Sequence, residues 1–151
     1  MAYNEDWVPP CGLYCGVCGI MYATRDDNKK FAELLAGVYN LPVEKIHCEG
    51  CLAGGEATFE YCRVCPIKSC TAERGYEGCH QCDEFPCEFI DNFPMPVGKR
   101  VMLRAIPRWR EVGTEQWVAE EEARYVCPEC GARLFRGSKR CRECKVEVDV
   151  D

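Results

Sequence analysis

The stretch CPECGARLFRGSKRCREC, residues 127–144, contains two C-x2-C pairs that are separated by ten residues. Two residues between paired cysteines let a tight turn direct both sulfurs at one ion, and two such turns complete a tetrahedral four-sulfur site. Gly131 follows the first pair, at a position where such a turn often needs a positive φ. The stretch therefore predicts one metal site whose ligands are Cys127, Cys130, Cys141 and Cys144.

The same stretch resembles a zinc ribbon, in which each cysteine turn lies on a hairpin with short strands around it. The resemblance implies a structural zinc ion, and iron held as in rubredoxin is the alternative. Four thiolates around a zinc ion carry a net negative charge, so we interpret the basic residues near the turns as compensation for it. These residues are Arg133, Arg136, Lys139, Arg140, Arg142 and Lys145.

Cysteines are abundant in the rest of the chain, since 15 of the 151 residues are cysteine. The other C-x2-C pairs are Cys15/Cys18, Cys48/Cys51, Cys62/Cys65 and Cys79/Cys82, and the single cysteines are Cys11, Cys70 and Cys87. These pairs match either in chain order, first with second and third with fourth, or alternately, first with third and second with fourth. Their spacing does not decide between the two arrangements.

The single cysteines have two interpretations. In the first, they form one more metal site, and His47 or His80, which are the only histidines, supplies its fourth ligand. In the second, they pack in the core as small apolar side chains. Both interpretations stay open at the level of the sequence.

The start of the chain bears on the chemistry of these cysteines. MAYNEDWVPP is acidic and polar, unlike a signal peptide, and no apolar run approaches the roughly 20 residues that span a bilayer. We therefore expect a cytoplasmic protein without membrane contact, in which dense cysteines bind metal rather than form disulfides. The odd number of cysteines agrees, because fifteen cannot all pair within one chain.

The stretch CGLYCGVC, residues 11–18, has the C-x3-C-x2-C spacing that holds a catalytic iron–sulfur cluster in radical S-adenosylmethionine enzymes. Those enzymes need a βα barrel around the cluster, and no series of alternating strands and helices follows here. The run of cysteines typical of ferredoxins is absent too. An iron–sulfur cluster within residues 1–90 nevertheless stays an alternative to zinc.

Three segments between the cysteines have helical patterns. Residues 26–40 predict a helix that Asp26 or Asp27 caps and Asn40 ends, with an apolar stripe formed by Phe31, Leu34, Leu35 and Val38. Residues 99–110 predict either a helix kinked at Pro107 or a helix followed by a turn, with Val101, Leu103 and Ile106 in the core. Thr114 is expected to cap the last predicted helix, whose apolar side is Trp117, Val118 and Tyr125.

The charges of residues 99–125 permit two interpretations. Lys99, Arg100, Arg104, Arg108 and Arg110 either meet phosphate or an acidic partner, or form an ordinary solvated face. The following helix carries Glu115, Glu120, Glu121 and Glu122. If it lies against the basic stretch, it neutralises these charges within the protein. The formal charge of −6 for the whole chain also argues against a general polyanion binder.

These patterns predict a small, metal-stabilised fold of mixed α+β and irregular structure. We expect a cysteine-rich metal-binding domain at residues 1–94, a helical connector at 95–125, and a zinc ribbon at 126–151, called the ribbon below. NFPMPVGK, residues 92–99, is the predicted linker that ends the first domain.

The cysteine motifs CGLYCGVC, CEGC, CRVCPIKSC and CHQCDEFPCEFI resemble, in this order, the cysteine-rich prokaryotic family called domain of unknown function 3795. The stretch GTEQWVAEEEARYVCPECG is similar to the tail of some members. The resemblance implies a cytosolic zinc-binding protein of uncharacterised activity. The metal ligands that it implies are Cys11, Cys15, Cys18, Cys48, Cys51, Cys62, Cys65, Cys70, Cys79, Cys82 and Cys87.

The sequence thus predicts a non-enzymatic protein that holds about three or four zinc ions in structural four-cysteine sites. We expect it to bind a macromolecular partner, either a protein or a nucleic acid. The alternative is an iron–sulfur or thiol-based redox or metal-handling protein. No pair of nucleophile and base, phosphate-binding loop or paired carboxylates indicates catalysis.

Overall fold

The computed structural model describes residues 3–151, which form mostly helices joined by irregular segments. The α-helices are α1 (Gly19–Arg25), α2 (Lys29–Tyr39), α3 (Glu60–Arg63), α4 (Pro66–Arg74), α5 (Glu88–Asp91), α6 (Pro96–Val112) and α7 (Thr114–Arg124). Short 3₁₀ turns include Cys15–Val17 and Cys79–Gln81. Among the described residues, β structure is limited to two isolated antiparallel bridges, Val126 with Arg133 and Arg140 with Glu147. The expected α+β mixture is thus confirmed only as a mostly helical fold with few strands.

An asparagine caps each end of helix α2. The Asn28 side chain accepts a hydrogen bond from the Phe31 amide at 3.0 Å, so the predicted caps Asp26 and Asp27 were wrong. Asn40 ends the helix, as predicted, and the structure shows it in the left-handed conformation.

Only part of the predicted apolar stripe of α2 is buried. Phe31 is 1% exposed, whereas Leu34 and Val38 are 58% and 67% exposed. Residues four positions apart lie on the same face of a helix, and Phe31 and Leu35 form the face of α2 that packs into the core. The preceding helix α1 was not predicted, because its buried residues Ile20, Met21, Tyr22 and Ala23 are consecutive and show no period.

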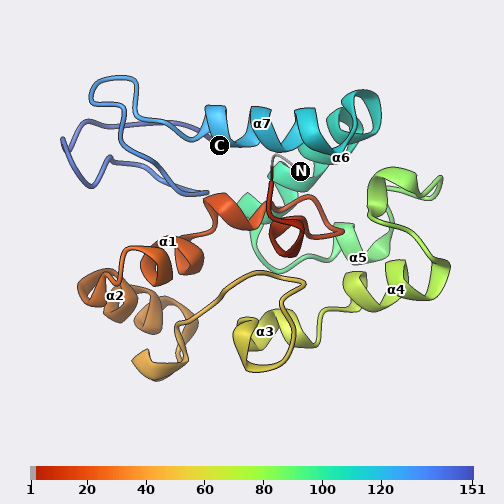
Figure 1. Ribbon diagram of the computed structural model, residues 1–151, viewed down its shortest axis with the longest axis horizontal. Coiled ribbons are helices and arrows are strands. Elements are labelled where there is room, and N and C mark those ends of the chain that lie inside the picture. Colours follow the sequence, from red (N-terminus) through yellow and green to blue (C-terminus); the bar gives the residue numbers. More distant parts are fainter. Residues whose placement is uncertain (1–2) are drawn as a thin grey trace.

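Helices α6 and α7 form the upper layer of the molecule in Figure 1. Helix α6 continues through Pro107, so of the two alternatives predicted there the helix followed by a turn was wrong. The predicted cap Thr114 was also wrong, because Gly113 is the N-cap of α7 and Thr114 is its first helical residue. The predicted linker is helical in its second half, because α6 begins at Pro96. Val101 and Ile106 lie in the core as expected, but Leu103 is 40% exposed.

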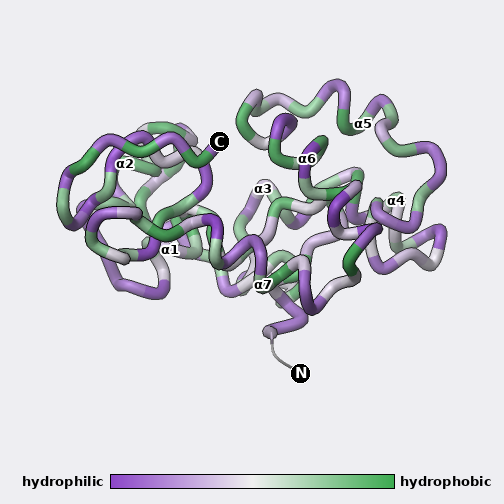
Figure 2. The backbone as a smooth tube through the Cα atoms, turned by 90° about the horizontal axis from the view of Figure 1, so that it is seen from above, coloured by the Kyte–Doolittle hydropathy of each residue, from purple (hydrophilic) through white to green (hydrophobic). Residues whose placement is uncertain are grey.

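Two apolar clusters make up the core. The larger contains residues of α6 and α7, together with Leu134 of the ribbon, Ile90 of α5 and Tyr14. The smaller lies between α1, α2 and the segment from Ile46 to Phe59. In Figure 2, α1, α2 and the C-terminal chain gather on one side, and α4, α5 and α6 gather on the other. No helix of the described chain combines the length and the apolar character that a bilayer crossing needs.

The acidic helix α7 lies against the basic helix α6, as the charge pattern predicted. Arg104 donates two hydrogen bonds, of 2.6 and 3.3 Å, to the carboxylate of Glu121, which is 3% exposed. Arg108 binds both carboxylate oxygens of Glu120 at 2.8 and 2.9 Å in a more exposed position. The basic stretch is therefore partly neutralised inside the protein.

Replacing Glu121 with alanine is expected to lower the free energy of unfolding by about 2–3 kcal/mol, because Arg104 would keep its charge without its buried partner. Glu120→Ala is the matched control, since that pair is solvent-exposed and should contribute at most about 1 kcal/mol. Urea denaturation of both variants measures the difference. Equal losses of stability in the two variants would show that burial does not strengthen the Arg104–Glu121 pair.

Candidate metal centre

The four ribbon cysteines form a compact group, called the ribbon tetrad. Their sulfur atoms all lie within 4.8 Å of one another. The sulfurs of Cys127 and Cys144 are 3.6 Å apart, as are those of Cys130 and Cys141. A tetrahedral zinc site with Zn–S bonds of about 2.3 Å requires sulfurs roughly 3.8 Å apart. The tetrad therefore has the donor set and the spacing of a four-thiolate metal site.

The two turns of the tetrad have matching backbones. The amides of Gly131 and Lys145 donate to the carbonyls of Cys127 and Cys141, each at 3.0 Å. Gly131 has φ +76° and Lys145 has φ +69°, so both turns close through the left-handed region. The positive φ predicted for Gly131 is confirmed, and its counterpart at Lys145 had no glycine to indicate it.

The electrostatics of the tetrad favour at least one thiolate. Hydrogen bonding from the backbone of Cys144 lowers the pKa of Cys141 to about 6, and the backbone of Glu143 adds to the effect. Cys127 and Cys141 are buried, at 2% and 1% exposure. Cys130 and Cys144 face solvent, so an ion has a path to the site.

The ribbon is attached to the N-terminal half through residues between its two turns. The Phe135 ring lies 4.8 Å from the Phe31 ring and 5.5 Å from the Tyr22 ring, centroid to centroid. The Arg136 guanidinium donates to the carbonyl of Tyr14 at 3.1 Å, and its backbone amide donates to Val17. The ribbon thus contacts the turn that carries Cys15.

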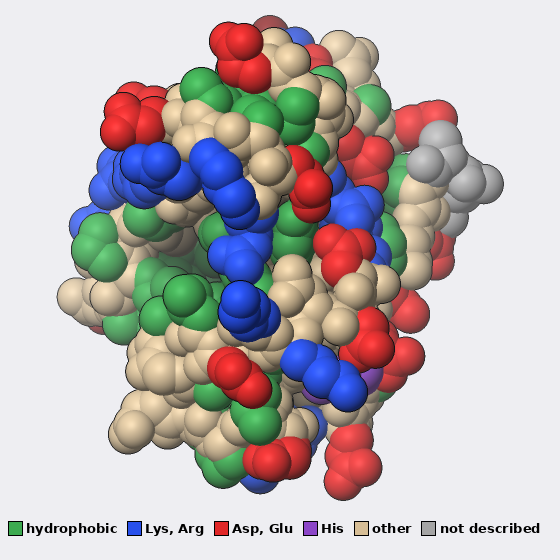
Figure 3. Space-filling model, turned by 90° about the vertical axis from the view of Figure 1, so that its left-hand side faces the viewer, with side chains coloured by type: hydrophobic (Ala, Val, Ile, Leu, Met, Phe, Trp, Pro, Cys, Tyr) green, Lys and Arg blue, Asp and Glu red, His purple; other side chains and the backbone are tan. Residues whose placement is uncertain are grey.

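Basic side chains of the ribbon form a band on one face of the molecule, with carboxylates beside them (Figure 3). Arg133 pairs with Asp26 at 3.1 Å. Arg142 lies over the Phe31 ring at 4.4 Å. The closest approaches of Lys139 and Arg140 to carboxylates are 3.9 and 3.7 Å. These contacts support a structural role for much of this charge.

Seven cysteines of the first half gather around the Cys15–Val17 turn, and we call them the seven-cysteine group. They are Cys11, Cys15, Cys18, Cys48, Cys51, Cys62 and Cys65. The Cys51 amide lies 3.3 Å from the Cys15 sulfur, which joins the first two pairs directly. Burial, together with the neighbouring thiols, raises the pKa of Cys11, Cys51 and Cys62 to about 12 each.

The other four cysteines, Cys70, Cys79, Cys82 and Cys87, line one small cavity and are called the second cysteine set. The two single cysteines Cys70 and Cys87 therefore share a cavity with Cys79 and Cys82, and Cys65 of the third pair also lies near Cys79. Cys11 does not line this cavity. In the described part of the chain, the ribbon tetrad is the one group of three or more potential ligands within 4.8 Å of each other.

Neither histidine belongs to such a group of ligands. His47 lies on the surface, with its Nε2 atom 3.3 Å from a Glu49 carboxylate oxygen. The His80 ring stacks on Trp109, with 3.8 Å between ring centroids. The structure therefore does not bring either histidine together with the single cysteines Cys11, Cys70 and Cys87 as a group of potential ligands.

Two arginines near the thiols were not singled out as site residues. An Arg74 nitrogen lies 3.7 Å from the Cys82 sulfur. Arg136 faces the seven-cysteine group, where burial opposes its charge and the thiols of Cys18, Cys11 and Cys15 favour it. Arg74 follows Cys70 by four residues on α4, one turn along the same side, and that spacing was a usable signal. Arg136 offered no local signal, because its partners are remote in sequence.

Comparisons with curated proteins and with solved structures gave no match. A family model matches residues 7–92, which hold all eleven N-terminal cysteines and end before the ribbon. This match confirms the resemblance indicated by the order of the cysteine motifs. The chain belongs to the family described as Protein of unknown function (DUF3795).

Proposed function

We propose that the protein is a non-enzymatic zinc-binding protein whose ions hold its fold in place. The observation that carries the proposal is the spacing of the ribbon tetrad, which suits zinc without rearrangement of the backbone. Four protein thiolates complete a tetrahedral zinc ion, so no position is open for substrate or water. Such an ion stabilises structure and does not activate a reactant.

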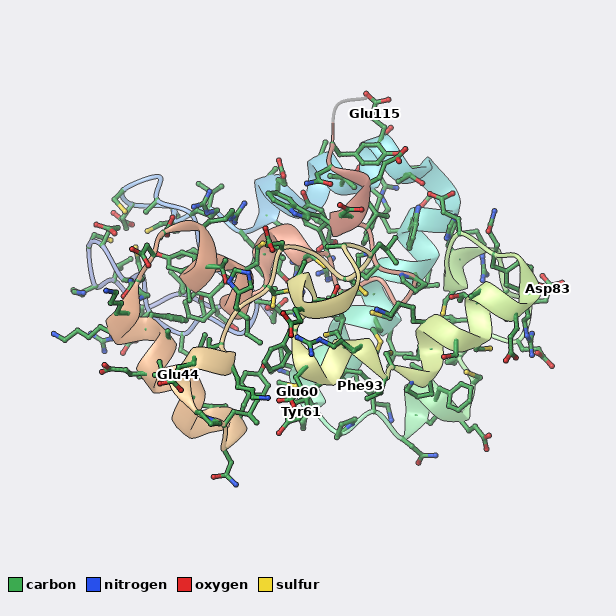
Figure 4. All side chains as sticks on the ribbon, turned by 60° about the horizontal axis from the view of Figure 1, so that its bottom comes forward. Glu44, Glu60, Tyr61, Asp83, Phe93 and Glu115 are labelled. Carbon is green, nitrogen blue, oxygen red and sulfur yellow. The ribbon has the colours of Figure 1, made fainter. Side chains whose placement is uncertain are left out.

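We further propose that the folded protein binds another protein. Leu34 and Val38 of α2, Tyr61 of α3 and Val64, which directly follows α3, are exposed apolar side chains. The Tyr61 hydroxyl donates to the carbonyl of Tyr39 at 3.1 Å, so α3 adjoins the end of α2. Tyr61 lies next to Glu60 on the outer surface of α3 (Figure 4). The pairing of basic residues with nearby carboxylates makes nucleic acid the weaker choice of partner.

Metal analysis tests the zinc proposal. The protein, purified without oxygen, should be colourless and contain about three zinc ions per chain, because 15 cysteines complete at most three separate four-cysteine sites. Zinc, iron and acid-labile sulfide are measured on the same sample, with the visible spectrum. Less than one zinc per chain after growth and refolding in zinc would overturn the proposal.

A second candidate is an iron–sulfur or thiol-based redox protein. The observation that favours it is the seven-cysteine group, which holds more thiols than one tetrahedral ion needs. A brown sample with iron and labile sulfide, bleached by reduction, would support this function. For the partner class, DNA or RNA binding that weakens steeply with rising salt would favour nucleic acid over protein.

A further inference from the structure

We propose that the second cysteine set binds one zinc ion of its own, with Cys70, Cys79, Cys82 and Cys87 as the four ligands. The inference deepens the proposed function and rests on it for the identity of the ion. It assigns Cys70 and Cys87, which the sequence left unpaired, to one site, and this site does not include Cys11. The site lies about the α4–α5 side of the molecule, away from the ribbon (Figure 1).

The first support is the cavity that these cysteines share. Its volume is about 20 Å³, and its other lining residues include Ile67, Thr71 and Ile90. A water molecule needs roughly 10–15 Å³ on the same measure, so the space admits one small ion. Four thiols around one space of this size provide the number and kind of ligands that structural zinc takes.

The second support is the position of each ligand on an ordered element. Cys79 and Cys82 lie at either end of a 3₁₀ turn, which closes through a 3.0 Å hydrogen bond from the Cys82 amide to the Cys79 carbonyl. Cys70 lies within α4, and Cys87 caps the start of α5. A turn with two ligands and two helices with one each can surround an ion from three directions.

The turn is also held firmly from outside. Arg110 of α6 donates to the carbonyls of His80 and Cys82 at 2.7 and 2.9 Å. The Cys79 amide donates to the Pro10 carbonyl at 2.8 Å. These contacts fix the backbone of two ligands, so rotation of the cysteine side chains is the main freedom left at the turn. One step between staggered rotamers moves a sulfur by a few ångströms.

The third support is a positive charge beside the thiols. The Arg74 guanidinium lines the cavity and approaches the Cys82 sulfur at 3.7 Å. It also pairs with Glu84, which orients it. A zinc ion with four thiolates carries a net negative charge, and a neighbouring guanidinium compensates it while donating to a ligand sulfur. Asp83, between the third and fourth ligands in sequence, lies at the outer edge of the molecule (Figure 4).

Alkylation of the zinc-loaded full chain tests the site directly. Trypsin cleavage after Lys68 and Arg74 isolates Cys70 in peptide 69–74, and Cys79, Cys82 and Cys87 fall in peptide 75–99. Before digestion, the zinc-loaded protein is treated with N-ethylmaleimide, with and without a zinc chelator. We expect the chelator to speed alkylation of both peptides together, by at least about tenfold, because bound thiolates are shielded.

A substitution supplies the second readout. Cys70→Ala should lose one zinc per chain and leave peptides 125–133 and 143–145 of the ribbon protected. Ser69→Ala is the matched control, since Ser69 is an exposed neighbour on the same helix, and it should keep the full zinc content.

Several results would overturn the inference. Fast alkylation of peptide 69–74 in zinc-loaded protein would show that Cys70 is not a ligand. Protection that ends only with a reductant would show a disulfide, and protection that the chelator does not change would show a buried free thiol. If Cys70→Ala does not fold, the wild-type alkylation decides alone. If the ribbon peptides of the zinc-loaded wild-type protein are also alkylated rapidly, that result would instead contradict the proposed function.

Discussion

The double substitution Cys127→Ser/Cys141→Ser is expected to remove one zinc ion per chain and to unfold the ribbon. These are the two buried cysteines of the ribbon tetrad, at 2% and 1% exposure. The ribbon has only two isolated bridges of regular structure, so we expect a bound ion to contribute much of its order. A structural zinc ion contributes an apparent free energy of about 10–16 kcal/mol, more than the whole stability of many domains.

Hydrogen exchange measures this loss locally. The amides of Cys127 and Cys141 donate to Ala132 and Val146 at 2.8 and 2.9 Å, and both should lose protection. Lys139→Ser is the control, because its contact with Asp149 is long and exposed and should contribute at most about 1 kcal/mol. Unchanged protection in the double variant would mean that the ribbon folds without an ion.

Trp109→Ala is expected to lower the free energy of unfolding by about 3–5 kcal/mol, the usual effect of removing a buried large aromatic ring. Trp109 is fully buried between two rings: Trp117 lies 4.4 Å away and His80 lies 3.8 Å away, both nearly parallel to it. Alanine would leave a large cavity where α6, α7 and the turn at His80 meet. Urea denaturation of the zinc-loaded variant measures the loss.

Trp109→Phe provides the comparison. It retains an aromatic ring but removes the hydrogen bond of 2.9 Å from the indole nitrogen to the Thr114 hydroxyl. Its loss should be smaller than that of alanine, with about 1 kcal/mol due to the hydrogen bond. A loss below about 1 kcal/mol for Trp109→Ala would contradict the role of this stack in the core.

The parts of the molecule that the sequence predicted are those that local interactions determine. The ribbon tetrad follows from two turns ten residues apart, each closed by its own backbone. The end of α2 at Asn40 follows from the tolerance of asparagine for the left-handed conformation. The apolar side of α7, with Trp117, Val118 and Tyr125 all buried, follows from helical periodicity.

The parts that could not be predicted depend on contacts between remote segments. Pro107 is tolerated inside α6, where its neighbours Ala105, Ile106 and Trp109 are fully buried. Packing there outweighs the local preference of proline to end a helix. Likewise, nothing in the spacing of Cys70 and Cys87 connects them, because α4 and α5 meet around Cys79 only after the chain has folded.

The attachment of the ribbon through Phe135 and Arg136 has a thermodynamic consequence. Both residues lie between the two halves of the ribbon tetrad, so an ion that orders the tetrad also orders their contacts with Phe31 and Tyr14. Linkage is reciprocal. Any change that stabilises the contact between the ribbon and the N-terminal half must strengthen metal binding in the ribbon by the same factor. Titration of the metal-free chain with zinc should therefore fill the ribbon cooperatively with the folding of the N-terminal half.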